Sequence, residues 1–217
     1  MKNRTTLMST IACLLPLVLA AILYPQLPEQ IGVHFNSAGE VDNYMPKNIV
    51  VFGFPILLAL LNLYTHFRVN QDPQVEYAGL SIKKISKWLI PVISVVFLPI
   101  TLFISIGASI PIVLIAQALA GVVVVITGNY LPKCKRNYTI GIKLPWTLNS
   151  EENWNKTQRF TGFVWTIGGF VIILNAFLNL WVYLIIVEIA LLLVLPFIYS
   201  YVYYRKEQGI GHWDGNS

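Results

Sequence analysis

Charged residues are scarce in this sequence. Asp, Glu, Lys and Arg make up 12% of the 217 residues, whereas a water-soluble domain carries about 25%. Charge is missing altogether from residues 5–28, 48–67, 88–132, 160–187 and 189–204. A helix crosses the roughly 30 Å hydrocarbon core of a bilayer in about 20 residues, and the run 88–132 is long enough to cross twice. The scarcity of charge excludes a soluble globular protein and predicts a membrane protein.

Cysteine and the common ligand-binding motifs are also scarce. We expect Cys13 and Cys134 to be unpaired, and neither has the spacing of a metal site. The glycines at 128, 141, 162, 168 and 169 follow neither the P-loop nor the dinucleotide-binding spacing. Glu188 has no second carboxylate, His or Cys that the sequence places beside it as an acid and base pair. We therefore expect no cofactor, no bound metal ion and no enzymatic activity.

The apolar runs predict an all-α, polytopic protein of the cell membrane with six transmembrane helices. The expected spans are 7–25, 48–68, 88–106, 110–131, 160–179 and 182–204, with reversals at 107–111 and 179–181. The first run could be mistaken for a secretory signal. Pro16, the lack of a small-residue cleavage site and the spans that follow favour a retained helix.

Basic residues orient these spans. The side that holds both termini would carry Lys2, Arg4, Arg68, Lys83, Lys84, Lys87, Lys133, Lys135, Arg136, Lys143, Lys156, Arg159, Arg205 and Lys206. The opposite side would carry Lys47 alone. The positive-inside rule then places both termini in the cytoplasm. The net charge of +5 indicates attraction to anionic membrane lipid rather than direct binding of nucleic acid.

The stretch 26–47 would lie outside the cell. Pro28 begins an extended segment, and Asn36 to Gly39 is typical of a turn because Asn and Gly tolerate positive φ. His34 with the single carboxylate of Asp42 is a poor metal signal. Two interpretations stay open for His34, Asn36, Gly39 and Asp42: an extracellular recognition surface, or a folded structural cap.

The stretch 132–159 would lie in the cytoplasm and is too organised for a simple connector. Alternation at Tyr138, Ile140, Ile142 and Leu144 predicts an extended segment that ends at Pro145. Asn149 as N-cap with Glu152 three residues later predicts the start of a helix in or near the membrane interface, ahead of span five. The loop is either an interfacial segment held in depth by its Trp, Lys and Arg residues, or a docking surface for a cytoplasmic partner.

Polar residues inside the apolar runs are the remaining candidates. Glu188, Asn175 and Gln117 lie at a similar distance from the outer ends of their spans and could form one buried cluster. That cluster would be either a hydrogen-bonded group around a neutral Glu188 or a site that senses a toxin or an ion. Asn62 and His66 are expected to make hydrogen bonds between helices.

The two loops together resemble the SdpI family, membrane immunity proteins for the sporulation-delaying toxin, with an amino-terminal segment similar to DUF1648. Pro28, His34, Phe35, Asn36, Gly39, Asp42 and Lys47 carry the DUF1648 resemblance. The SdpI signature is carried by Asn129, residues 132–137, Tyr138, Gly141, Ile142, Pro145, Trp146, Thr147, Trp154, Lys156, Thr157, Arg159 and Gly162. Lys143 stands where the family pattern has Arg, and Gln158 where it has His. The expected domains are 1–70, the DUF1648-like segment, and 71–217, the SdpI-like segment.

The resemblance implies protection of the cell from a secreted, membrane-active peptide toxin. It also implies that the toxin-engaged protein can hold a cytoplasmic winged-helix repressor at the membrane. The docking loop would then comprise Asn137, Tyr138, Gly141, Lys143, Pro145, Trp146, Thr147, Trp154, Thr157 and Arg159. The alternative is a transporter or channel for a small peptide or an ion, which the absence of an internal repeat disfavours.

Overall fold

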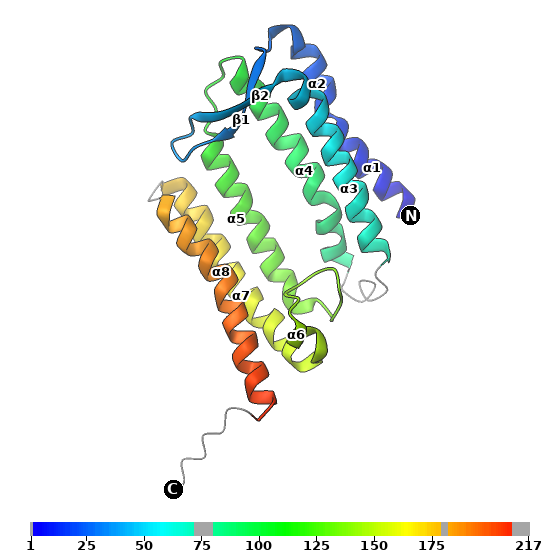
Figure 1. Ribbon diagram of the computed structural model, residues 1–217, viewed down its shortest axis with the longest axis vertical. Helices are drawn as coiled ribbons and strands as arrows, with labels where there is room; N and C mark the ends of the chain where they lie inside the picture. Colours follow the sequence, from blue (N-terminus) through cyan, green and yellow to red (C-terminus); the bar gives the residue numbers. More distant parts are fainter. Residues whose placement is uncertain (1, 72–79, 179–181, 210–217) are drawn as a thin grey trace. The chain divides into compact units, whose positions relative to one another are not determined.

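The computed structural model describes residues 2–71, 80–178 and 182–209, and 78% of the protein is helical (Figure 1). Its elements are α1 (Lys2–Leu14), α2 (Pro16–Leu23), η1 (Tyr24–Gln26), β1 (Gln30–Phe35), β2 (Val41–Pro46), η2 (Ile49–Gly53), α3 (Phe54–Gln71), α4 (Leu80–Ser105), α5 (Ile112–Tyr130), η4 (Leu131–Lys133), α6 (Pro145–Asn149), α7 (Glu151–Leu178) and α8 (Val182–Glu207).

Six helical segments are long and apolar enough to cross a membrane. They are Arg4–Gln26, Ile49–Gln71, Lys83–Ser105, Ile112–Lys133, Glu151–Leu178 and Leu184–Glu207. Many of their large apolar side chains are exposed, including Ile186 and Leu193 on α8, as lipid-facing residues are. The prediction of a multi-pass membrane protein with six spans is confirmed. The predicted reversal at 179–181 lies outside the described residues.

The first span is bent where the sequence carries Pro16. Helix α1 ends at Leu14 and α2 begins at Pro16, because proline has no amide hydrogen to continue the helical ladder. The chain separates into two compact units, one of residues 1–71 and 83–116 and the other of residues 72–82 and 117–217. We call them unit 1 and unit 2 and describe each by itself.

Unit 1 carries a β-hairpin, which the all-α prediction did not include. Strands β1 and β2 pair antiparallel, with irregularities around His34. The predicted turn at Asn36 to Gly39 is confirmed: the Asn36 side chain accepts hydrogen bonds from the amides of Ala38 and Glu40, and Gly39 has φ of 84°. A two-stranded sheet alone is marginally stable in water. Here Ile31 is fully buried in a core with Ala20, Leu23, Leu27, Val50, Val51 and Leu102, which fastens β1 to the helices.

Unit 2 is built on two long helices, α7 and α8, which lie side by side in Figure 1. Helix α7 runs without interruption from Glu151 to Leu178. The predicted interfacial helix is therefore the beginning of the fifth span, and the separate short helix is α6. Helix α5 approaches α7 closely at two pairs of glycines, Gly121 with Gly169 and Gly128 with Gly162. Small residues at such crossings let helix backbones come together in membranes.

Candidate functional site

The segment 134–150, between η4 and α7, has no regular secondary structure apart from the short α6 and is held mainly by side chains; we call it the 134–150 loop. Asn137 lies at its centre and is fully buried. Its Oδ1 atom accepts hydrogen bonds from the amides of Thr139 and Ile140, at 2.9 and 2.6 Å. Its Nδ2 atom donates to the carbonyls of Lys135 and Ile140, at 2.8 and 3.0 Å. The Asn137 carboxamide thus provides hydrogen-bond partners for backbone groups that would have none in an unpaired extended segment, the structure predicted for this stretch.

Trp154 on α7 anchors the first half of the loop, from Cys134 to Gly141. Its indole is fully buried, and Nε1 donates to the Cys134 carbonyl at 2.8 Å. Gly141, with φ of 117°, passes over the ring, and a Cβ at this position would lie 2.9 Å from Trp154 Cη2. Only glycine fits that backbone conformation and that contact without strain.

Gln158, one turn further along α7, holds the loop at Ile142, where its second half begins. Its Oε1 accepts from the Ile142 amide at 3.1 Å, and its Nε2 donates to the Ile142 carbonyl at 3.2 Å. A planar carboxamide can address both groups of one residue because its acceptor and donor lie side by side. The ring nitrogens of His point in different directions. Gln158 therefore serves a structural purpose at the position where the resemblance led us to expect His.

Two caps order the chain between Gly141 and α7. The Thr147 hydroxyl accepts from the Leu144 amide at 2.9 Å and so caps the short α6, which Pro145 begins. Ser150 then caps α7, since its Oγ accepts from the Asn153 amide at 3.1 Å. The prediction of Asn149 as the N-cap was wrong by one position: Asn149 is the last residue of α6, and the hydroxyl of the next residue reaches the helix instead.

Helix α8 completes the site. Trp146 Nε1 donates to Ser200 Oγ at 3.1 Å, and the indole packs against the rings of Phe197, Tyr201 and Tyr204, with centroids 5.5 to 5.9 Å apart. Asn153 Nδ2 donates to the Ser200 carbonyl at 3.1 Å. The 134–150 loop, the start of α7 and the end of α8 therefore form one packed structure.

Only part of the predicted docking set is available on the surface. Asn137, Thr147, Trp154 and Thr157 are each 0% exposed, and the contacts above place them in the interior of this structure. Tyr138 is 61% exposed, and Lys143, Pro145 and Arg159 are exposed too. Gly141 and Trp146 are half-buried. A partner can therefore contact the exposed residues directly. The buried residues act on it only indirectly, because they hold the exposed residues in place.

Two groups outside the spans have shifted pKa values. Burial raises the pKa of the Cys134 thiol, and the hydrogen bond from Asn137 opposes this shift less strongly. The thiol therefore stays protonated and is a weak nucleophile. At the base of the hairpin, the hydrogen bond to Glu29 raises the pKa of Lys47. This ion pair, at 2.8 Å, closes the two strands where they leave the membrane-spanning helices.

The structure brings together two of the predicted extracellular residues. His34 Nδ1 and Asp42 Oδ1 lie 2.5 Å apart, and the two side chains are 68% and 43% exposed. Asn36 and Gly39 build the turn between the strands. Within the described residues, no group of three or more His, Cys, Asp or Glu side chains is arranged to hold a metal ion.

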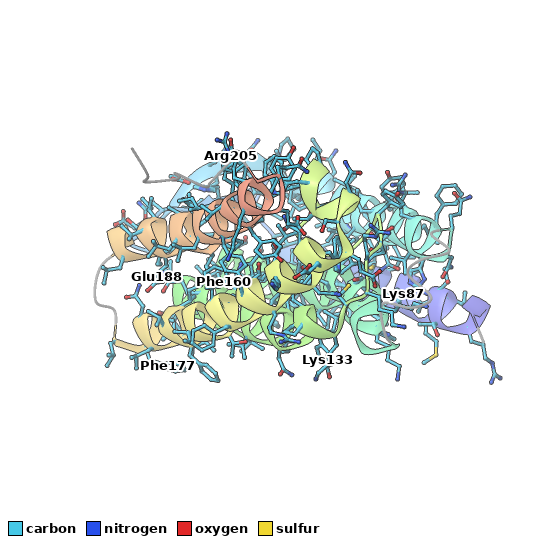
Figure 2. All side chains as sticks on the ribbon, turned by 90° about the horizontal axis from the view of Figure 1, so that it is seen from below. Lys87, Lys133, Phe160, Phe177, Glu188 and Arg205 are labelled. Carbon is cyan, nitrogen blue, oxygen red and sulfur yellow. The ribbon has the colours of Figure 1, made fainter. Side chains whose placement is uncertain are left out.

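The intramembrane candidates lie in unit 2. Asn175 is buried and Gln117 is half-buried. Glu188 lies toward the beginning of α8, with Arg205 at the other end of that helix (Figure 2). Within the described part of the chain, its Oε2 atom is enclosed without a hydrogen-bond partner. A cluster of all three residues stays a prediction.

In unit 1, Asn62 and His66 on α3 confirm the expected hydrogen bonds between helices. The hydroxyls of Thr6 and Ser9 on α1 lie 2.9 and 2.8 Å from the two ring nitrogens of His66. Ser9 also donates to Asn62 Oδ1 at 3.0 Å, and Asn62 Nδ2 donates to the Lys87 carbonyl on α4 at 2.9 Å. The hydroxyl partners Thr6 and Ser9 were not predicted from the sequence, where only their spacing on α1 could have suggested them.

Comparison with known proteins matches both regions. Residues 133–200 match the SdpI/YfhL protein family, and residues 11–59 match the domain of unknown function DUF1648. Immunity protein SdpI of Bacillus subtilis (strain 168) is 29% identical over 208 residues, which cover 95% of this chain and 99% of that protein. No solved structure matches significantly. With six candidate spans, the chain is a multi-pass membrane protein that is similar to DUF1648 over residues 11–59, to the SdpI/YfhL protein family over residues 133–200, and to Immunity protein SdpI over nearly its whole length.

Proposed function

We propose that this protein gives its cell immunity to a secreted, membrane-active peptide toxin. The observation that carries the proposal is the similarity to Immunity protein SdpI, which extends over 95% of this chain and 99% of that protein. The six spans support it, because they place the protein in the membrane on which such a toxin acts. The distribution of Lys and Arg supports an orientation with both termini and the 134–150 loop in the cytoplasm, and the hairpin outside.

The hairpin is the part of the protein that would meet the toxin first. Its exposed acidic residues Glu40 and Asp42 favour a cationic visitor, and the pair of His34 with Asp42 lies on its surface. Hydrogen bonds within the turn hold one end of the hairpin, and the ion pair of Glu29 with Lys47 holds its base. Together they keep the strands in one arrangement. A preorganised surface binds with a smaller loss of entropy than a mobile loop would.

We expect the wild-type chain to protect a toxin-sensitive cell that lacks its own immunity gene. Survival would be measured against the purified sporulation-delaying peptide, with membrane levels of each variant confirmed. Asp42→Asn should reduce protection because it removes the negative charge that faces His34. Ser37→Ala, an exposed change in the same turn, should leave protection unchanged. Trp146→Ala and Glu188→Gln, tested in parallel, report on the 134–150 loop and on the membrane interior. No protection by the wild-type chain at normal expression would remove this toxin as the target.

We further propose that the exposed part of the 134–150 loop and of early α7 receives a cytoplasmic winged-helix repressor, the partner that the family resemblance implies. Tyr138, Lys143 and Arg159 supply an aromatic ring and two cations there, and aromatic and Arg side chains dominate protein interfaces. Trp154 and Asn137 hold the backbone that presents Tyr138 and Lys143.

Arg159→Ala should weaken recruitment of a fluorescently tagged winged-helix repressor to toxin-treated membranes by about fivefold, since truncating an Arg that contributes strongly to an interface costs about 1 kcal/mol or more. Arg205→Ala on α8 removes the same charge from another exposed position and should have little effect. Equal loss in both variants would indicate general electrostatic attraction of the repressor to the basic surface of the protein. Undiminished recruitment in Arg159→Ala would place the docking surface elsewhere.

A further inference from the structure

An open groove runs between α1 and α3 of unit 1, which lie side by side (Figure 1). Its volume is about 470 Å³. Leu7, Leu63 and Phe67 form its apolar walls, and the first and last of these are 61% and 54% exposed. Both helices belong to membrane spans, so the groove opens toward lipid.

The lining of the groove is not purely apolar. Thr6, Thr10, His66 and Asn70 also line it. These groups have hydrogen-bond partners within unit 1: the Thr6 hydroxyl lies 2.9 Å from His66 Nδ1, and Thr10 Oγ1 donates to Asn62 Oδ1 at 3.3 Å. The apolar walls therefore suit an acyl chain, and a volume of several hundred Å³ is that of an ordinary ligand site.

Basic residues lie next to one end of the groove. Lys87, which is 9% exposed, places its Nζ atom 2.8 Å from Asn70 Oδ1, and Figure 2 labels this residue on α4. Arg4 precedes the wall residue Leu7 by three positions, so the two lie on the same side of α1. The described acidic residues of unit 1, namely Glu29, Glu40 and Asp42, all belong to the hairpin region at the other end of the spans. The charged end is therefore complementary to an anion.

We propose that this groove binds one anionic phospholipid of the bilayer. Its phosphate lies at the end formed by Arg4, Asn70 and Lys87, and an acyl chain follows Leu7, Leu63 and Phe67. Basic pockets between membrane helices bind anionic headgroups in this way. The proposal is independent of toxin immunity.

The test compares two lipids with identical acyl chains. The purified full-length protein is mixed with equal amounts of phosphatidylglycerol and phosphatidylcholine, and native mass spectrometry measures which lipid stays bound. We expect preferential retention of phosphatidylglycerol. Arg4→Gln should lower the ratio of bound phosphatidylglycerol to phosphatidylcholine about fivefold, as expected for one cation near an anionic headgroup. Asn70→Asp should lower it as well, because a carboxylate beside Lys87 neutralises the ammonium group.

Arg68→Gln is the matched control. Position 68 is two residues from both His66 and Asn70, and residues two apart do not share a helix face. This variant should keep the wild-type ratio. Equal retention of the two lipids, or an equal loss in Arg68→Gln, would overturn the proposal. Displacement of phosphatidylglycerol by millimolar inorganic phosphate would also overturn it, because the groove would then bind a phosphate ion rather than a lipid. Arg4 is exposed, so its variant stays informative even if Asn70→Asp misfolds.

Discussion

Replacing Trp154 with alanine is expected to lower the free energy of unfolding by about 3 to 5 kcal/mol, the usual cost of truncating a buried aromatic side chain. The indole is 0% exposed and donates a hydrogen bond to the Cys134 carbonyl. Its loss leaves a cavity under Gly141 and an unsatisfied buried carbonyl. Thermal denaturation of the protein in mild detergent, followed by far-UV circular dichroism, measures the effect.

Two variants separate the causes. Trp154→Phe keeps most of the ring volume but removes the hydrogen bond, and we expect it to cost about 1 to 3 kcal/mol, the penalty of an unsatisfied buried group. Phe163→Ala removes an aromatic ring from the same helix at a position that is 66% exposed, and it should change the melting temperature far less. If Trp154→Ala melts like Phe163→Ala, the indole does not hold the loop to α7.

Gly169→Ala is expected to destabilise the protein by about 1 to 3 kcal/mol, as overpacked contacts do. A Cβ at this position would lie 2.7 Å from the Val125 amide nitrogen and 2.8 Å from the Gly121 carbonyl oxygen, both on the backbone of α5. Backbone atoms cannot turn aside as a side chain can. The alanine methyl group must therefore push α5 and α7 apart along their whole contact.

Gly168→Ala provides the control at the neighbouring position of the same helix. A Cβ there would meet only the side chain of Leu192, with its Cδ2 atom at 2.6 Å, and leucine can change rotamer. Both substitutions gain the same intrinsic helix propensity of alanine over glycine, so the difference between the two unfolding free energies isolates the backbone contact. Equal stability of the two variants would show that α5 and α7 do not pack through Gly169.

Much of the architecture follows from local properties of the chain. Each span is a predominantly apolar run of about 20 residues, the composition that a helix needs to cross the hydrocarbon core. The turn from Asn36 to Gly39 is set by residue types that accept its backbone angles. Asn62 and His66 were recognisable as hydrogen-bonding residues because a polar group inside an apolar span requires a partner.

The details of the candidate site depend on partners that are distant in the sequence. Trp154 and Thr157 are suitable residue types for an exposed docking surface, and only their contacts with Cys134 and Asn153 show that they lie in the interior. The choice of Ser150 over Asn149 as the cap of α7 depends on where α6 ends. The sequence could not decide these points because burial is a property of the assembled chain and not of the residue.

By itself the sequence determined the membrane location, the six spans and the family resemblance, all of which rest on composition and short motifs. Tertiary structure decided the rest. It placed Ile31 in a core that stabilises a hairpin and gave Gly169 and Gly121 a role as points of contact between backbones. It also set Asn137 as the centre of a loop whose only regular element, within the described residues, is the short α6. The physical reason is the same in each case: close packing and hydrogen bonding join residues that no local pattern relates.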